Sequence, residues 1–169
     1  MRKTSTRDIA ITGIFAALIF LFTAYVLHIP IGASGGYIHL GDAMLYLCAS
    51  LLPAPYALAA GAIGAGFADV LTGSTVWLLA SIIVKPLVAL CFTSKQRMLI
   101  CKRNWIALGL GGLISVAGYF IAGLVITGSF AVTIVDVPMN LLQAVGNGVF
   151  YLLMAGVLDR ANLKAMLLR

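Results

Sequence analysis

The chain has 169 residues, of which 62% are hydrophobic and 9% are charged, and its 11 Lys or Arg outnumber its 5 acidic residues to give a net charge of +6. About a quarter of the residues in an ordinary soluble domain are charged, so this composition, with a mean hydropathy of +1.09, excludes one. The basic residues lie at both termini and in one interior segment, between strongly apolar stretches. That distribution argues against nucleic acid and for the lipid bilayer as a partner.

Long apolar runs, interrupted by Gly, Pro and charged residues, predict six transmembrane helices. In chain order they span residues 8–27, 40–52, 56–71, 75–92, 105–126 and 137–158. The first run is an alternative candidate for a signal peptide, but it is longer than the usual run of about 7 to 15 apolar residues and no small-residue cleavage site follows it. Six spans of roughly 20 residues each take up most of the chain. We therefore predict that residues 1–169 form one transmembrane domain, with no room for a soluble ATPase domain.

Small side chains gather in the first half of the first predicted helix. Gly13, Ala16 and Ala17 lie there, and Gly13 and Ala17 have the small-xxx-small spacing that lets transmembrane helices approach closely. This face is predicted to contact either another subunit or a neighbouring helix of the same chain.

Ionisable residues occur in each of the next three predicted helices. Asp42 lies at the outer start of the second, Asp69 lies one turn from the outer end of the third, and Lys85 lies midway along the fourth beside a proline that favours a kink. Such groups are costly in lipid and need a partner, a wet cavity or a function. For Lys85, an ion pair with Asp69 that only holds helices together and a contact to a ligand are equally supported. Asp42 is predicted either to cap its helix or to contact a ligand.

Residues near the predicted span ends include types that are common at membrane interfaces. Tyr37, Trp77 and Trp105 are predicted to be interfacial anchors. His39 is also predicted to lie at the interface, because no second His stands at the spacing of a metal ligand. The three Cys have no CxxC spacing, and no HExxH motif or nucleophile with a base is evident. We therefore predict no metal site, no cofactor and no enzyme activity.

Amide side chains share one face of the sixth predicted helix. Asn140, Gln143 and Asn147 are spaced i, i+3 and i+7. Counted at about 1.5 Å per residue, Asn147 reaches a depth similar to that of Lys85. Interhelical hydrogen bonding explains such amides equally simply, but the shared face favours ligand contact. Polar groups from four helices thus predict a cavity that opens to the outside and ends near the bilayer midplane.

Basic residues cluster in three segments: before the first predicted helix, between the fourth and the fifth, and after the sixth. They are Arg2, Lys3 and Arg7; Lys95, Arg97, Lys102 and Arg103; and Arg160, Lys164 and Arg169. With six helices all three segments fall on one side of the membrane, which the positive-inside rule assigns to the cytoplasm. We therefore predict an all-α integral membrane protein with six transmembrane helices and both termini in the cytoplasm.

Several motifs occur in an order that resembles a known family of membrane proteins. They are residues 37–43 (YIHLGDA), Pro53, residues 61–64 (GAIG), residues 68–73 (ADVLTG), residues 82–87 (IIVKPL) and residues 137–144 (VPMNLLQA). Over nearly the whole chain, their order and the helix count are similar to those of the substrate-binding S components of energy-coupling factor (ECF) vitamin transporters, particularly the riboflavin-type group.

The resemblance implies a subunit of a prokaryotic plasma membrane that captures a vitamin or vitamin precursor on the outer side with high affinity. A transmembrane T subunit and two ATPase subunits would drive release inside. In that family an AxxxA-like motif on the first helix contacts the T subunit, and Gly13 and Ala17, with Ala16 beside them, match it, although Gly replaces the first Ala. The loop between the first two helices is a lid in the family, and residues 30–36 match it. The expected substrate-binding residues are Asp42, Asp69, Lys85, Asn140, Gln143 and Asn147.

The riboflavin-type group handles riboflavin, hydroxymethylpyrimidine and pyridoxine-like ligands, which are flat heteroaromatic rings with hydroxyls. A cavity with amides, one ammonium and few carboxylates suits a neutral ring, and we favour a small pyridine or pyrimidine. One alternative is a stand-alone ion- or proton-coupled carrier, which is expected to have inverted repeats, and no convincing internal similarity is evident. The other is a membrane-embedded structural subunit, in which Asp69 and Lys85 only hold helices together.

Overall fold

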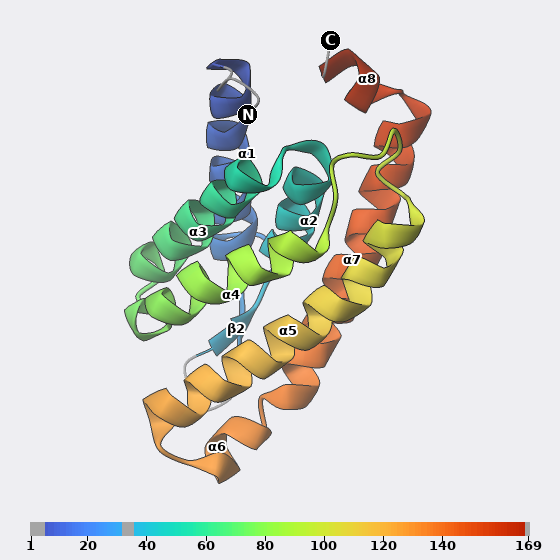
Figure 1. Cartoon of the computed structure of the whole chain (residues 1–169). Helices are drawn as coiled ribbons and strands as arrows, with labels where there is room; N and C mark the ends of the chain where they lie inside the picture. The colour runs from blue at the N-terminus through green and yellow to red at the C-terminus, as the bar shows by residue number, and fades with distance from the viewer. Residues whose placement is uncertain (1–5, 32–35, 168–169) are drawn as a thin grey trace.

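The structure is a computed structural model that describes residues 6–31 and 36–167 of the chain. Its helices are, in chain order, α1 (Thr6–Ala24), α2 (Gly41–Leu51), α3 (Ala54–Leu71), the short 3-10 helix η1 (Thr75–Trp77), α4 (Leu78–Cys91), α5 (Lys102–Thr127), α6 (Phe130–Ile134), α7 (Val137–Arg160) and α8 (Leu163–Leu167). Each of the six helices expected from the hydropathy pattern has a counterpart here (Figure 1).

The helices differ in whether they are long enough to cross a bilayer. Four segments are both long and apolar enough, namely Thr6–Ala24, Ala54–Leu71, Lys102–Thr127 and Phe130–Arg160. Two apolar segments are shorter, Gly41–Leu51 and Thr75–Cys91. At about 1.5 Å per residue, the 11 residues of α2 cover only about half of a 30 Å bilayer core. The chain is therefore a helical membrane protein in which α2 reaches across part of the membrane depth.

One segment departs from the all-α prediction. Strands β1 (Ile29–Ile31) and β2 (Gly36–Ile38) form an antiparallel pair in which Ile29 lies opposite Ile38. The sequence suggested only a loop here, and residues 32–35 of that loop lie outside the described residues. Isoleucine favours extended backbone, and the two strands satisfy each other's backbone groups where no helix is formed. The prediction of a purely helical fold was therefore wrong for this hairpin.

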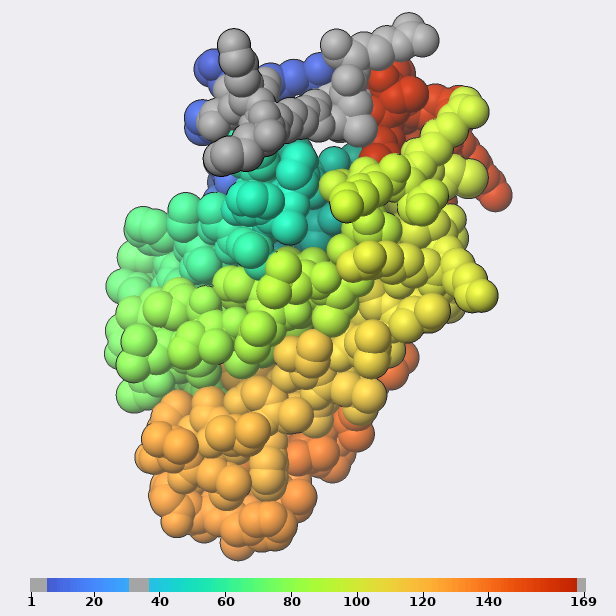
Figure 2. All heavy atoms as spheres, in the orientation of Figure 1, coloured from blue at the N-terminus to red at the C-terminus, as the bar shows by residue number. Residues whose placement is uncertain are grey.

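Helix α2 lies at the centre of the helical packing. All of its residues are buried, and it packs against α1, α3, α4 and α7. The surrounding helices contact one another in the order α1, α3, α4, α5 and α7, and Figure 2 shows α3, α4 and α5 side by side across one face. A helix enclosed on all sides carries polar groups that face protein and not lipid, and this arrangement places Asp42 inside the molecule.

The outward faces of the long helices are apolar. Ile14 on α1, Phe67 on α3, Leu79 on α4, Leu113 on α5 and Val145 on α7 are each more than half exposed. A soluble monomer rarely exposes apolar surface on this scale, whereas hydrocarbon chains solvate it well. The distribution of apolar residues outside and polar residues inside therefore suits a protein surrounded by lipid.

Helices α1 and α3 approach each other closely at Gly64. A Cβ atom added to Gly64 would lie 2.6 Å from the carbonyl oxygen of Ala16, so only glycine fits there. Ala16 is accordingly buried against α3, with 8% of its surface exposed. Gly13 and Ala17 lie on the exposed side of α1, and a Cβ on Gly13 would meet no atom within 4 Å. The small residues of α1 thus divide between an internal contact and a free face.

The two ends of the molecule differ in what they contain. In Figure 1 the N- and C-terminal ends of the described chain and the connection between α4 and α5 lie at one end, whereas β2 and α6 lie towards the other. The start of α1, the α4–α5 connection, the end of α7 and α8, which contain described basic residues of the three segments, belong to the first of these ends.

Candidate functional site

A small cavity lies beside the N-terminal end of α2, on the side of the molecule that contains β2. Its volume is about 40 Å³, which is room for about three water molecules. We call it the Asp69 cavity. Its lining residues are Thr23, Tyr37, His39, Ala65, Asp69, Trp77, Ser81, Lys85, Tyr119, Asp136, Asn140 and Gln143. Because these residues come from seven segments of the chain, the fold concentrates at one point polar groups that are far apart in the sequence.

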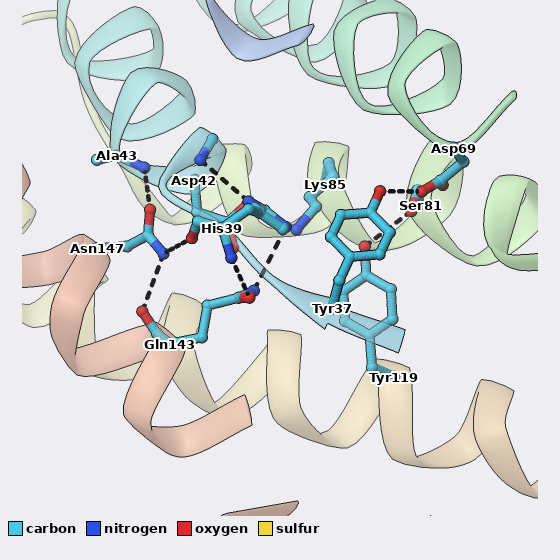
Figure 3. Close-up of polar contacts among 11 residues, drawn as sticks. Tyr37, His39, Asp42, Ala43, Asp69, Ser81, Lys85, Tyr119, Gln143 and Asn147 are labelled. Atoms are coloured by element: carbon cyan, nitrogen blue, oxygen red, sulfur yellow. Dashed lines mark hydrogen bonds and ion pairs between the residues drawn. The ribbon is translucent and has the colours of Figure 1, made fainter. Parts of the chain in front are cut away.

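The ammonium of Lys85 forms a buried ion pair with Asp42. Lys85 Nζ lies 2.6 Å from Asp42 Oδ1, and both side chains are less than 5% exposed (Figure 3). The ammonium also lies 4.9 Å from the centre of the Tyr119 ring. The pairing of Lys85 with Asp69 that the sequence suggested is therefore wrong. The two carboxylates lie at comparable depth, but α2 fills the centre of the bundle and brings Asp42 to the face of α4 that carries Lys85.

Asp42 does not cap its own helix. The residue at the N-cap position is Leu40, and no side chain of the helix accepts a capping hydrogen bond there. The capping role suggested for Asp42 is therefore wrong as well. Its carboxylate still lies in the first turn, where the positive end of the helix dipole favours a negative charge. Lys85 and the helix dipole together stabilise the buried carboxylate.

Asp69 contacts the hairpin instead of Lys85. The Tyr37 hydroxyl, on β2, donates a hydrogen bond of 2.6 Å to Asp69 Oδ1, and the Ser81 hydroxyl lies beside the same carboxylate (Figure 3). Burial and the Asp69 charge raise the pKa of Tyr37, which keeps the phenol protonated as a donor. The Tyr37 ring also packs on that of His28, with centroids 4.1 Å apart. This one hydrogen bond ties the hairpin to α3 across the cavity.

Two amides of α7 hold the turn that leads from β2 into α2. Gln143 Oε1 accepts a hydrogen bond from the His39 backbone N–H at 3.0 Å, and Asn147 Oδ1 accepts one from the Ala43 N–H at 2.8 Å. Asn147 Nδ2 in turn donates to the His39 carbonyl at 2.8 Å. Asn147 thereby adds a second acceptor for the Ala43 N–H, which also donates to the Leu40 carbonyl at 3.2 Å. Asn147 is fully buried and lies behind the cavity wall, whereas Asn140 and Gln143 line the cavity.

His39 is buried and neutral. Only 5% of its surface is exposed, and burial, reinforced by the positive charge of Lys85, lowers its pKa to about 3. Its Nδ1 accepts a hydrogen bond from the Gly41 N–H at 3.0 Å, so the ring proton resides on Nε2. The prediction of an interfacial histidine was wrong, because the hairpin folds inward and carries His39 to the start of α2.

Three buried polar atoms around the cavity have no hydrogen-bond partner among the described residues. They are Thr23 Oγ1, Asp69 Oδ2 and Trp77 Nε1, and all three residues line the cavity. Buried polar groups in native proteins are nearly always paired, and an orphaned one calls for an explanation such as a ligand. The cavity therefore presents an acceptor at Asp69 and a donor at Trp77 that the described wall residues leave unpaired. A polar ligand can pair with both.

The sequence placed some of these residues elsewhere and gave no role to others. Trp77 was predicted to be an interfacial anchor, but only 6% of its surface is exposed, because the 3-10 turn directs it inward; Trp105, at 55%, remains exposed. Thr23, Ser81 and Tyr119 had no sequence signal, since a hydroxyl in an apolar helix is common. Of the six expected binding residues, the structure brings Asp69, Lys85, Asn140 and Gln143 together around the cavity, with Asp42 and Asn147 behind it.

A second, apolar groove runs between α1 and α3. Its lining includes the exposed Gly13 and Ala17 on α1 and Phe67 on α3. No polar pair crosses it, so its surface suits another apolar helix. Ala16, which the sequence grouped with these residues, packs mainly inward on α3.

Comparison with known proteins gives one informative match. The family model for the ECF-type riboflavin transporter, S component, matches residues 3–160. No curated protein matches the chain.

Proposed function

This chain belongs to the family of ECF-type riboflavin transporter S components, and from that premise we propose that it captures a water-soluble vitamin or vitamin precursor with high affinity for delivery across the plasma membrane of a prokaryote. Its family is one of transporter components and not of enzymes. The proposed partners are a transmembrane T subunit and two ATPase subunits. The proposed ligands are pyridoxine-like, hydroxymethylpyrimidine-like or riboflavin-like rings.

The observation that carries the proposal is the convergence of three unpartnered polar atoms on one cavity. Thr23, Asp69 and Trp77 lie on different segments, and each brings to the same cavity an atom that has no partner among the described residues. An unsatisfied buried polar group costs about 1–3 kcal/mol, so three at one place weaken the fold. A ligand that supplies the missing partners recovers that free energy, which supports high affinity.

We further propose six spans with both termini in the cytoplasm. The α4–α5 connection and α8, which carry described basic residues, lie at the end of the molecule opposite β2 (Figure 1), and under the positive-inside rule this supports an Asp69 cavity that faces the outside. Helix α2 covers half of the bilayer core, and the β1–β2 hairpin fills the depth above it. Non-helical backbone at this depth needs partners for its polar groups, and β1 and β2 pair with each other.

The hairpin is the proposed lid. The present volume of about 40 Å³ is too small for a heteroaromatic ring, and the Tyr37 hydroxyl occupies one oxygen of Asp69. Movement of β1 and β2 away from α3 breaks the hydrogen bond between Tyr37 and Asp69 and opens the cavity without unpacking a helix. Entry of the ligand from the outside therefore requires the hairpin to move first.

Fluorescence titration with a panel of B vitamins and their precursors tests the proposal. The chain has two Trp, of which Trp77 lines the cavity and Trp105 is exposed. We expect one compound to quench the wild-type and Trp105→Phe proteins in the nanomolar range and the Trp77→Phe protein much less. Absence of binding across the panel would contradict the proposal. Uptake into vesicles without ATPase subunits would favour the alternative of a stand-alone carrier.

The exposed face of α1 is the proposed contact with the T subunit. Gly13→Leu fits without disturbing the monomer, because a Cβ there meets no atom within 4 Å. We expect this substitution to abolish ATP-driven uptake in the reconstituted complex while ligand binding by the isolated chain stays at the wild-type level. Gly109→Leu on α5 is the matched control, since its Cβ also meets nothing within 4 Å. If Gly13→Leu also loses ligand binding, this face serves internal packing instead.

A further inference from the structure

The charges around the Asp69 cavity bear on the chemical class of its ligand, an inference that rests on the proposed function. The ammonium of Lys85 is 2.6 Å from Asp42 and points away from Asp69 (Figure 3). The carboxylate of Asp69 lines the cavity and accepts a hydrogen bond from Tyr37. His39 adds no positive charge because its ring is neutral. The one ammonium of the cavity wall is therefore engaged by Asp42 and not by Asp69.

Asp69 is the carboxylate that a ligand reaches. Its side chain is buried, with 3% of the residue surface exposed. Oδ1 accepts the hydrogen bond from Tyr37, and Oδ2 is without a partner in the described part of the chain. The hydroxyls of Tyr37 and Ser81 are neutral, and the Lys85 ammonium, which also acts on this carboxylate, is bound to Asp42. A buried carboxylate is stabilised by a cation or by several strong donors, and a positively charged donor at Oδ2 would supply both.

The cavity walls suit a flat ring that carries such a donor. The ring centroids of Trp77 and Tyr119 are 5.9 Å apart. The Tyr37 ring lines the cavity on the side where the hairpin lies (Figure 3). Aromatic faces attract cations as well as other rings. The free Trp77 Nε1–H requires an acceptor on the same ligand, such as a ring nitrogen or a hydroxyl oxygen.

We propose that the ligand is a small heteroaromatic amine, protonated on an amino group or a ring nitrogen, that donates to Asp69 Oδ2 and accepts from Trp77 Nε1. An anionic ring would have to draw Lys85 away from Asp42. A neutral flavin brings no positive charge to Asp69 and needs far more room. This assignment differs from the neutral ring favoured from the sequence, which rested on amides, one ammonium and few carboxylates, because the structure pairs that ammonium with Asp42.

Matched pairs of probes that differ only in the donor test the assignment on the folded wild-type protein. One pair is pyridoxamine and pyridoxine, which differ by an aminomethyl and a hydroxymethyl group; another is 4-amino-5-hydroxymethylpyrimidine and its 4-oxo analogue. We expect the amine of at least one pair to bind about tenfold or more tightly than its partner, the effect of one charge-assisted hydrogen bond. Equal or tighter binding of the neutral members would overturn the assignment and leave vitamin capture standing.

Two variants identify the group responsible. Asp69→Asn keeps an acceptor for Tyr37 but removes the charge, so we expect it to abolish the preference for the amine. Trp77→Phe removes only the indole N–H, so we expect it to weaken both members of a pair by a similar factor and to preserve the preference. If Asp69→Asn still binds the amine more tightly than its neutral partner, another group is responsible for the preference and the proposed contact is refuted. If no member of any pair and no vitamin binds the wild-type protein, the proposed function itself fails, and this assignment with it.

Discussion

Helix α2 has a buried polar cluster at each end, and the two clusters differ in whether their atoms are paired. At its N-terminal end the Asp69 cavity contains three polar atoms that have no partner within residues 6–31 and 36–167. At its C-terminal end Ser50, Thr93, Asn104 and Tyr151 form what we call the Asn104 cluster, in which every described buried side-chain polar atom has a partner. The three residues with unpartnered atoms and the four residues of the Asn104 cluster are all buried, so burial alone does not distinguish the two clusters.

The Asn104 cluster closes the end of the molecule that contains both described chain ends. Asn104 Oδ1 accepts from the Thr93 N–H at 2.8 Å, and its Nδ2 donates to the Leu99 carbonyl at 2.9 Å. The Tyr151 hydroxyl donates to the same carbonyl, also at 2.9 Å. Lys164 on α8 donates to the Ser50 carbonyl at 2.7 Å. These bonds fix the irregular connection between α4 and α5 on the end of α2.

The difference separates a structural role from a binding role. A polar network whose members are all paired rigidifies the fold and offers nothing to a ligand. A network with orphaned atoms around a cavity lowers stability and offers specific partners, which is the balance expected at a functional site. Substitutions in the Asn104 cluster should therefore lower stability and leave ligand binding unchanged. Substitutions of the unpartnered groups at the Asp69 cavity should weaken ligand binding and change stability little.

Lys85→Met should have the largest effect, because it leaves Asp42 buried without a cation. Breaking a buried ion pair by removing one partner costs about 3–5 kcal/mol, and we expect unfolding in detergent to show a loss of that size. The double variant Asp42→Asn with Lys85→Met is the control and should recover most of the loss. Wild-type stability in the single variant would show that the ion pair does not carry the packing of α2.

Asn104→Ala is expected to come next, at about 3 kcal/mol, because the Thr93 N–H loses its acceptor inside the protein. Ligand affinity of the folded fraction should remain at the wild-type level, since the Asn104 cluster lies at the other end of α2. Gln96→Ala, an exposed position of the same connection, should change the free energy of unfolding by less than about 0.5 kcal/mol. A fall in affinity without a fall in stability would reverse the roles given to the two clusters.

Acid should destabilise the protein through His39. The folded state keeps the pKa of His39 at about 3, since burial and then the charges of Lys85 and His28 lower it more than Asp42 raises it. The unfolded chain binds a proton near pH 6.5, so the contribution of His39 is complete above that pH and is lost as the pH falls towards 3. The loss amounts to about 1.4 kcal/mol per pH unit. His39→Asn should show a shallower dependence of the melting temperature on pH between 7 and 5; an unchanged slope would exclude His39 as the source.

Asp69→Asn should have the smallest effect on stability, within about 1 kcal/mol and in the stabilising direction, because it removes an uncompensated buried charge. Its effect on ligand binding should nevertheless be large. Calorimetric melting with and without ligand measures both. A strong destabilisation would show that Asp69, like Asn104, has a structural role, and would contradict the binding role given to it.

Hydropathy predicted the helices well and their lateral arrangement poorly. Predicted residues 137–158 became Val137–Arg160 and predicted residues 105–126 became Lys102–Thr127, because an apolar run of this length is a local signal. The depth of Lys85 and its place beside a cavity followed from counting residues along the helices. Its partner did not, since Asp42 and Asp69 lie at similar depth and only the packing order of the helices distinguishes them. The burial of Trp77 was equally out of reach, because the side chain of a short 3-10 turn has no periodic signal.

Mass spectrometry of the small molecules released from the purified protein tests the central claim most directly, namely that the Asp69 cavity is a ligand site and the Asn104 cluster is not. We predict that the wild-type protein releases one small heteroaromatic amine in near-stoichiometric amount. The Gln96→Ala control should release the same amount of the same compound, and Asp69→Asn should release much less. Release of no such compound from the wild-type protein, or equal release from Asp69→Asn, would contradict the account.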